Sequence, residues 1–170
     1  MRRPKQLRTA ARRTAMRIVL RGWLRASVMG GLVAGSVDIG SAAVIYHASP
    51  LLIMRAIAGG LLGPGALGMG LAISLLGLAL QWAMSILIAA IFCAVLPWLP
   101  RRLRSSVLLT GCGCGLVVFA VMQYAVVPLS ALHRWPHVTI PWLVENLLAM
   151  ALFGCILASI ARRLMDDARA

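Results

Sequence analysis

Four long apolar stretches constrain this chain more than any other feature of its sequence. They run from about residue 28 to 46, 67 to 96, 107 to 127 and 138 to 160. A helix needs about 18 or more apolar residues to cross the roughly 30 Å of hydrocarbon in a bilayer. Helices are favoured because an open strand or loop would leave backbone groups unpaired in lipid. The sequence therefore predicts an all-α integral membrane protein, a bundle of four spanning helices. The second stretch, the longest, is expected to tilt or to extend beyond the hydrocarbon.

The overall composition excludes a water-soluble globule. Of the 170 residues, 61% are hydrophobic and 12% are charged, whereas a soluble domain carries roughly a quarter charged residues. Intrinsic disorder is also excluded, because it requires low hydrophobicity. The net charge of +13 does not indicate nucleic acid as a partner, since its basic residues lie in discrete clusters outside the apolar stretches.

The distribution of these basic residues predicts the orientation. The segments outside the spans carry, in chain order, 9, 1, 3, 1 and 3 Lys and Arg residues. The positive-inside rule places the richer segments in the cytoplasm. We therefore expect a multi-pass membrane protein with the N- and C-termini cytoplasmic. The predicted organisation is a basic amphipathic cytoplasmic segment (1–26), a four-span domain (27–163) and a cytoplasmic tail (164–170).

The N-terminal segment has a basic face. Arg13, Arg17, Arg21 and Arg25 recur every four residues, which aligns them along one side of a helix. We expect residues 8–25 to form an amphipathic helix that lies on the cytoplasmic leaflet and binds anionic lipid headgroups. A disordered basic tail that serves only to set the topology, and a mitochondrial presequence, are the alternatives.

Two connections have their own predicted structure. The stretch that begins at Pro50 is apolar but too short to cross, which predicts a short outer interfacial helix ending near Gly59 and Gly60; a flexible loop is the alternative. The connection Pro97-Trp-Leu-Pro100-Arg-Arg is short, so the second and third spans are expected to be antiparallel neighbours.

Glycine pairs mark candidate packing faces. Gly31 and Gly35 in the first span, and Gly111 and Gly115 in the third, both follow the pattern G-x-x-x-G. Such pairs let helix axes approach closely, which favours association in lipid. Four helices enclose little volume, so a wide substrate cavity within one protomer is not expected. A second copy of the chain or another membrane protein is the expected partner.

Polar residues gather in the middle and outer half of the predicted membrane region. Asp38 lies about 15 Å from the inner end of the first span at 1.5 Å per residue. An acid at that depth is costly unless it faces the bundle and is paired or protonated. The candidate intramembrane polar cluster consists of Asp38, Arg55, Gln81, Tyr124, Glu145 and Asn146.

This cluster has two interpretations. In the functional one it lines a pocket that opens outward, in which Asp38 and Glu145 bind protons or cations. In the structural one, Arg55 pairs with Glu145 or Asp38 and the cluster fastens the bundle, and the sequence favours this second interpretation.

Histidines and cysteines indicate no metal site or cofactor. His47, His133 and His137 form an outer polar rim. The last two are four residues apart, a spacing that would suit a metal on a regular helix, but Pro136 and Pro141 disfavour one. Cys93, Cys112, Cys114 and Cys155 are interpreted as small packing residues. Since no nucleophile, phosphate-loop or metal motif is present, an enzyme is not expected.

The last span carries a resemblance to a known family. The strings Pro128-Leu129, Pro141-Trp142-Leu-Val-Glu145-Asn146 and the closing Arg162-Arg163 resemble the end of the YagU-like bacterial inner-membrane proteins. The glycine-rich first span is also similar. The resemblance implies a small inner-membrane protein linked to acid or envelope stress, and it supplies no reaction.

These observations predict a non-enzymatic accessory or envelope protein that acts through helix–helix contacts. The alternative is an oligomeric proton- or cation-coupled transporter or channel that uses Asp38 and Glu145.

Overall fold

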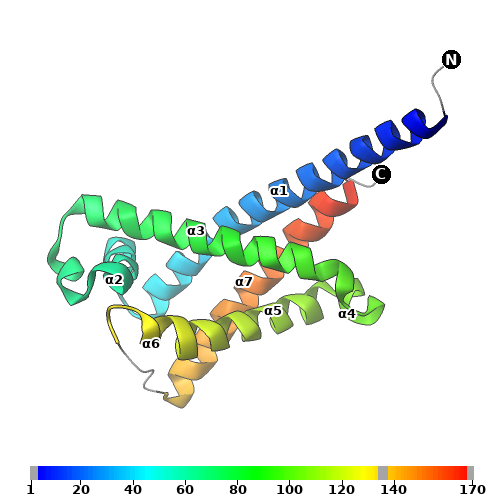
Figure 1. The fold of residues 1–170 in the computed structure, drawn as a ribbon. Helices are drawn as coiled ribbons and strands as arrows, with labels where there is room; N and C mark the ends of the chain where they lie inside the picture. The colour runs from blue at the N-terminus through cyan, green and yellow to red at the C-terminus, as the bar shows by residue number, and fades with distance from the viewer. Residues whose placement is uncertain (1–3, 134–137, 168–170) are drawn as a thin grey trace.

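The computed structural model describes residues 4–133 and 138–167, and this part of the chain is helical with no strand (Figure 1). Four helical segments are long and apolar enough to cross a membrane: Met16–Ile45, Leu71–Trp98, Val107–Leu129 and Ile140–Met165. This confirms the predicted all-α, four-span fold. The beginning of the first helix and the end of the last lie at the same end of the molecule (Figure 1).

The first helix, α1, is continuous from Pro4 to Ile45. At 1.5 Å per residue its 42 residues extend over about 63 Å, twice the thickness of the hydrocarbon core. The segment 8–25 therefore does not form a separate helix but continues directly into the first span. The helix ends where His47 adopts a left-handed conformation (φ 49°) and the Ala48 N–H bonds back to the Ala43 carbonyl, a common helix terminator.

The predicted short helix is present as α2, Pro50–Leu62. It begins where the sequence indicates, because the Ser49 side chain accepts a hydrogen bond from the Leu52 N–H and Pro50 occupies the first turn. It does not end at Gly59 and Gly60. It continues to Leu62 and ends at its C-cap Gly63, whose φ is 85°. A 3₁₀ turn, η1 (Pro64–Gly68), follows.

The second span is α3, Leu71–Val95, followed by the 3₁₀ turn η2, Leu96–Trp98. A short helix, α4 (Arg101–Ser105), connects it to the third span. That span consists of α5 (Val107–Val121), a π-helical segment η3 (Met122–Val126) and α6 (Val127–Leu129). Pro128 cannot donate a backbone hydrogen bond to the preceding turn, and the π-helical segment lies in that turn. The fourth span belongs to α7, Ile140–Asp167.

The four spans pack in the order α3, α1, α7, α5, because α1 contacts both α3 and α7, and α7 contacts α5. The short helix α2 packs on α3. The second and third spans run antiparallel as predicted, but they are not packed neighbours: α3 packs on α1 and α2, whereas α5 packs on α7 (Figure 1). The physical reason is that Gly31 and Gly35 allow α1 to approach α3 closely, whereas Gly111 and Gly115 allow α5 to approach α7.

The core lies where α1, α3 and α7 meet. Its buried hydrophobic residues are small or slender at most positions, and they are Ala26, Ala34, Ala89, Phe92, Cys93, Leu96, Phe153, Leu157, Ala158 and Ala161. Alanines at these positions allow the three backbones to approach closely, which is the usual means of stabilising helix packing in lipid.

Candidate functional site

The candidate site begins with a hydrogen bond between the first two spans. Gln81 of α3 donates from Nε2 to the Oδ2 of Asp38 on α1, over 2.7 Å. Gln81 is buried and Asp38 is half-buried. The acid thus faces the bundle, as its cost in lipid requires, and it has a polar partner there.

A second polar contact fixes α2 on α3. The Nε of Arg55 donates to the Ser74 hydroxyl over 3.1 Å, and that hydroxyl donates to the Leu51 carbonyl over 3.3 Å. Ser74 is completely buried. About one turn after Ser74, the backbone of α3 at Gly77 lies so close to the Met54 carbonyl of α2 that a Cβ could not be accommodated. The cation is therefore part of a tight α2–α3 junction.

A third contact joins the end of α1 to the beginning of α7. The Tyr46 hydroxyl accepts a hydrogen bond from the Trp142 indole over 3.1 Å and donates to the Asn146 Oδ1 over 3.4 Å. The Asn146 amide also donates to the Trp142 carbonyl over 2.8 Å. The Trp142 ring packs against Phe119 of α5, with ring centroids 6.0 Å apart. This network connects α1, α7 and α5.

The predicted polar cluster is thus divided into three separate contacts. Glu145 and Tyr124 join none of them, because both side chains are exposed on the outside of the bundle. The expected pairing of Arg55 with Glu145 or Asp38 is not observed: Arg55 contacts Ser74, and Asp38 contacts Gln81. All buried side-chain nitrogen and oxygen atoms of the described residues have a hydrogen-bond partner.

The histidines lie in the connections. His47 and His133 are both exposed and both have a positive φ, of 49° and 47°, while His137 lies outside the described residues. In the described part of the chain, no three His, Cys, Asp or Glu side chains gather in a group that could hold a metal ion. Cys155 of α7 lies against Gly111 of α5, at the interface between those helices.

The basic face of α1 is solvent-accessible. Arg17, Arg21 and Arg25 are exposed, whereas the side chain of Arg13 lies outside the described residues. These three arginines belong to the same continuous helix as the first span, and they are exposed on a segment whose other side, at Gly22 and Ala26, is buried.

The four glycines of the G-x-x-x-G pairs lie at helix contacts. A Cβ on Gly31 would lie 2.5 Å from the Ile86 Cα, and one on Gly35 would lie 2.6 Å from the Ser85 Oγ, both on α3. A Cβ on Gly111 would lie 2.6 Å from the Cys155 Cα of α7, and one on Gly115 would collide with the Met150 carbonyl. A Cβ on Gly154 of α7 would likewise collide with the Gly111 carbonyl.

Sequence reasoning missed the small polar residues that accompany these contacts. Ser27, Ser74, Ser85 and Thr110 are buried, and Ser36 accepts a hydrogen bond from the Trp82 indole over 3.1 Å. Serine and threonine are frequent at helix interfaces in membranes, so their recurrence inside the spans was the available signal.

No family model, curated protein or solved structure matches this chain. The class of the protein is therefore defined by its fold. With four apolar helices of spanning length, it is a multi-pass α-helical membrane protein.

Proposed function

We propose that this protein is a non-enzymatic accessory protein of a bacterial inner membrane, with both termini in the cytoplasm, that acts through helix–helix contacts with a second copy or another membrane protein. The observation that carries the proposal is the pairing of its intramembrane polar groups. Asp38, Arg55 and Asn146 each contact a neighbouring helix. They hold the bundle together and do not converge on a shared space.

The proposed orientation is supported by charge and geometry together. The N-terminal part of α1, the helix α4 and the end of α7 lie on one side of the molecule (Figure 1). These segments carry most of the Lys and Arg residues, and such segments remain in the cytoplasm.

The surface available for a partner is largest on the third span. Only 11% of its most apolar part is buried, against 28% for the first and fourth spans. Leu116, Val117 and Val121 are exposed on its outer face. Because α5 packs mainly on α7 among the other spans, its remaining surface can receive another helix without rearrangement of the bundle.

The proposal is tested by photo-cross-linking in native membranes. A photoreactive amino acid replaces Val117 on α5, which is 63% exposed. A matched probe at Leu87, 59% exposed on α3, is the control. We expect protein adducts from Val117 in greater yield than from Leu87, identifiable by mass spectrometry. Monomer alone at both positions would overturn the proposal.

A proton- or cation-coupled transporter or channel built as an oligomer is the competing function. One observation favours it: Asp38, an acid within the first span, is only half-buried as a residue. Against it, Glu145 is exposed and lies outside the Asp38–Gln81 contact. The two functions are distinguished by ion flux in proteoliposomes, which only a transporter or channel would support.

A further inference from the structure

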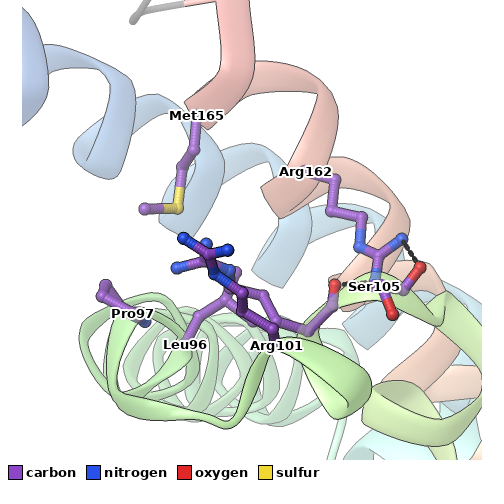
Figure 2. A pocket seen from close by; sticks show the side chains of 7 residues that line it. Leu96, Pro97, Arg101, Ser105, Arg162 and Met165 are labelled. Atoms are coloured by element: carbon purple, nitrogen blue, oxygen red, sulfur yellow. Dashed lines mark hydrogen bonds between the residues drawn. The ribbon is translucent and has the colours of Figure 1, made fainter.

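A pocket of about 430 Å³ lies between the turn η2, the helix α4 and the end of α7 (Figure 2). Its polar lining residues are Arg101, Arg104 and Ser105 of α4 and Arg162 of α7. Its apolar lining residues are Leu96, Pro97 and Met165. The pocket thus combines three guanidinium groups with an apolar wall, and no acidic residue lines it in the described part of the chain.

Arg162 holds this pocket together. Its guanidinium donates to the Ser105 carbonyl over 3.0 Å and also to the Arg104 carbonyl. These two carbonyls belong to the end of α4, so Arg162 fixes α4 to α7 (Figure 2). The position of the other two arginines relative to α7 follows from this contact.

Arg101 and Arg104 keep their hydrogen-bond donors for a ligand. Both are exposed, and neither side chain makes a hydrogen bond to another described residue. Like charges that line one pocket repel each other, and an anion removes that repulsion. The planar guanidinium suits phosphate oxygens, which it contacts with two donors at once.

The depth of the pocket indicates the kind of phosphate. Arg101 follows the second span, which ends at Trp98, and Arg162 lies in the last turns of the fourth span, which ends at Met165. The pocket therefore lies at the end of two spans, where lipid headgroups are found. Basic pockets between membrane helices bind anionic headgroups. Leu96, Pro97 and Met165 offer an apolar surface to the glycerol and upper acyl chains.

We infer that this pocket binds the phosphate of an anionic phospholipid. Arg101 and Arg104 contact the phosphate oxygens, whereas Arg162 contributes charge and positions α4. This site is distinct from the basic face of α1, and it does not depend on the function proposed above.

The test uses the full chain, purified in mild detergent, stripped of lipid and examined by native mass spectrometry. Phosphatidylglycerol is titrated, with phosphatidylcholine of the same acyl chains as the uncharged comparison. In Arg101→Gln/Arg104→Gln we expect the affinity for phosphatidylglycerol to fall about 30-fold, from two cations near a headgroup. The control is Arg102→Gln/Arg163→Gln, which removes the same total charge, one arginine from α4 and one from α7, outside the pocket lining.

Inorganic phosphate distinguishes the two sources of the ligand. Millimolar phosphate that fails to displace phosphatidylglycerol supports the lipid headgroup. Phosphate that binds alone, and loses binding in Arg101→Gln/Arg104→Gln only, supports the same pocket with free phosphate as its ligand. Equal phosphatidylglycerol binding by both double variants, or no preference over phosphatidylcholine, overturns the inference.

A third variant examines the acids that follow Met165 in α7. If phosphatidylglycerol binds only after Asp166→Asn/Asp167→Asn, these carboxylates rather than a lipid neutralise the arginines, and the inference fails. Unchanged or stronger binding in this variant supports it.

Discussion

Gln81 donates a hydrogen bond to Asp38 across the interface between α3 and α1, over 2.7 Å. This contact joins the most deeply placed acid of the chain to a buried amide on the neighbouring span. A polar pair between two helices favours their association in lipid. The contribution of this hydrogen bond to the free energy of unfolding can be measured with variants of the two residues.

A double-mutant cycle measures this contact. We expect Asp38→Leu and Gln81→Leu each to lower the free energy of unfolding in detergent, since either change leaves the other polar group unpaired at a cost of about 1–3 kcal/mol. The double variant should be less destabilised than the sum, by about 0.6–1.7 kcal/mol, the range of interhelical hydrogen bonds in membranes. Strict additivity would show that the two side chains do not interact.

The close approach of α5 and α7 predicts a contrast between two glycines on α5. A Cβ on Gly111 would lie 2.6 Å from the Cys155 Cα, whereas Gly113 has no atom near the corresponding position. Gly111→Ala should therefore destabilise the protein by about 1–3 kcal/mol through overpacking. Gly113→Ala should be neutral or stabilising, since alanine favours helix over glycine by about 1 kcal/mol. Thermal unfolding in detergent measures both, and equal effects would contradict the packing described.

The attachment of α4 to α7 depends on Arg162. Arg162→Met removes its hydrogen bonds to the Ser105 and Arg104 carbonyls while it keeps the length of the side chain. We expect a modest loss of stability, about 1 kcal/mol for a partly exposed contact. We also expect faster tryptic cleavage within α4. Arg163→Met, an exposed neighbour, is the control, and cleavage at the same rate in both variants would refute the contact.

The end of α1 carries local backbone strain at His47, whose φ is 49°. A left-handed conformation costs a non-glycine residue about 1–2 kcal/mol, and glycine adopts it freely. His47→Gly is therefore expected to raise the free energy of unfolding by roughly 1 kcal/mol, whereas His47→Ala should not. Chemical denaturation in detergent compares the two. A less stable glycine variant would mean that the histidine side chain itself stabilises the turn.

The spans could be predicted from the sequence because their signal is strong and local. Long apolar runs can cross lipid only as helices, and the Ser49-Pro50 pair marks the beginning of α2 by its capping chemistry. The continuity of α1 could not be predicted from the change in composition near residue 26. A change from charged to apolar residues moves a helix from an aqueous to a lipid environment, but it does not break the backbone hydrogen bonds of the helix.

The order of the spans was harder to predict. The short Pro97–Arg102 connection favours neighbouring helices, yet α3 packs on α1 and α5 on α7. Contacts at Gly31 and Gly111 decide this arrangement, and their partners on the other helix cannot be identified from one sequence.

The depth of the candidate site residues in the membrane could be predicted from the sequence, but the direction in which their side chains point could not. Asp38 and Glu145 could be placed along the membrane normal by counting residues, whereas the side of the helix on which each lies depends on packing. Asp38 faces α3 and Glu145 faces outward. For this reason the single predicted cluster is divided into separate contacts in the structure.

Ion flux in proteoliposomes tests the central claim most directly, that the intramembrane polar groups stabilise the bundle and do not conduct. Wild-type protein and Asp38→Asn are compared, because asparagine can still accept the hydrogen bond from Gln81 and so should preserve the fold. We predict that wild-type vesicles dissipate proton and potassium gradients no faster than protein-free vesicles. A flux that Asp38→Asn abolishes, with thermal unfolding unchanged, would contradict the account and establish a transporter or channel.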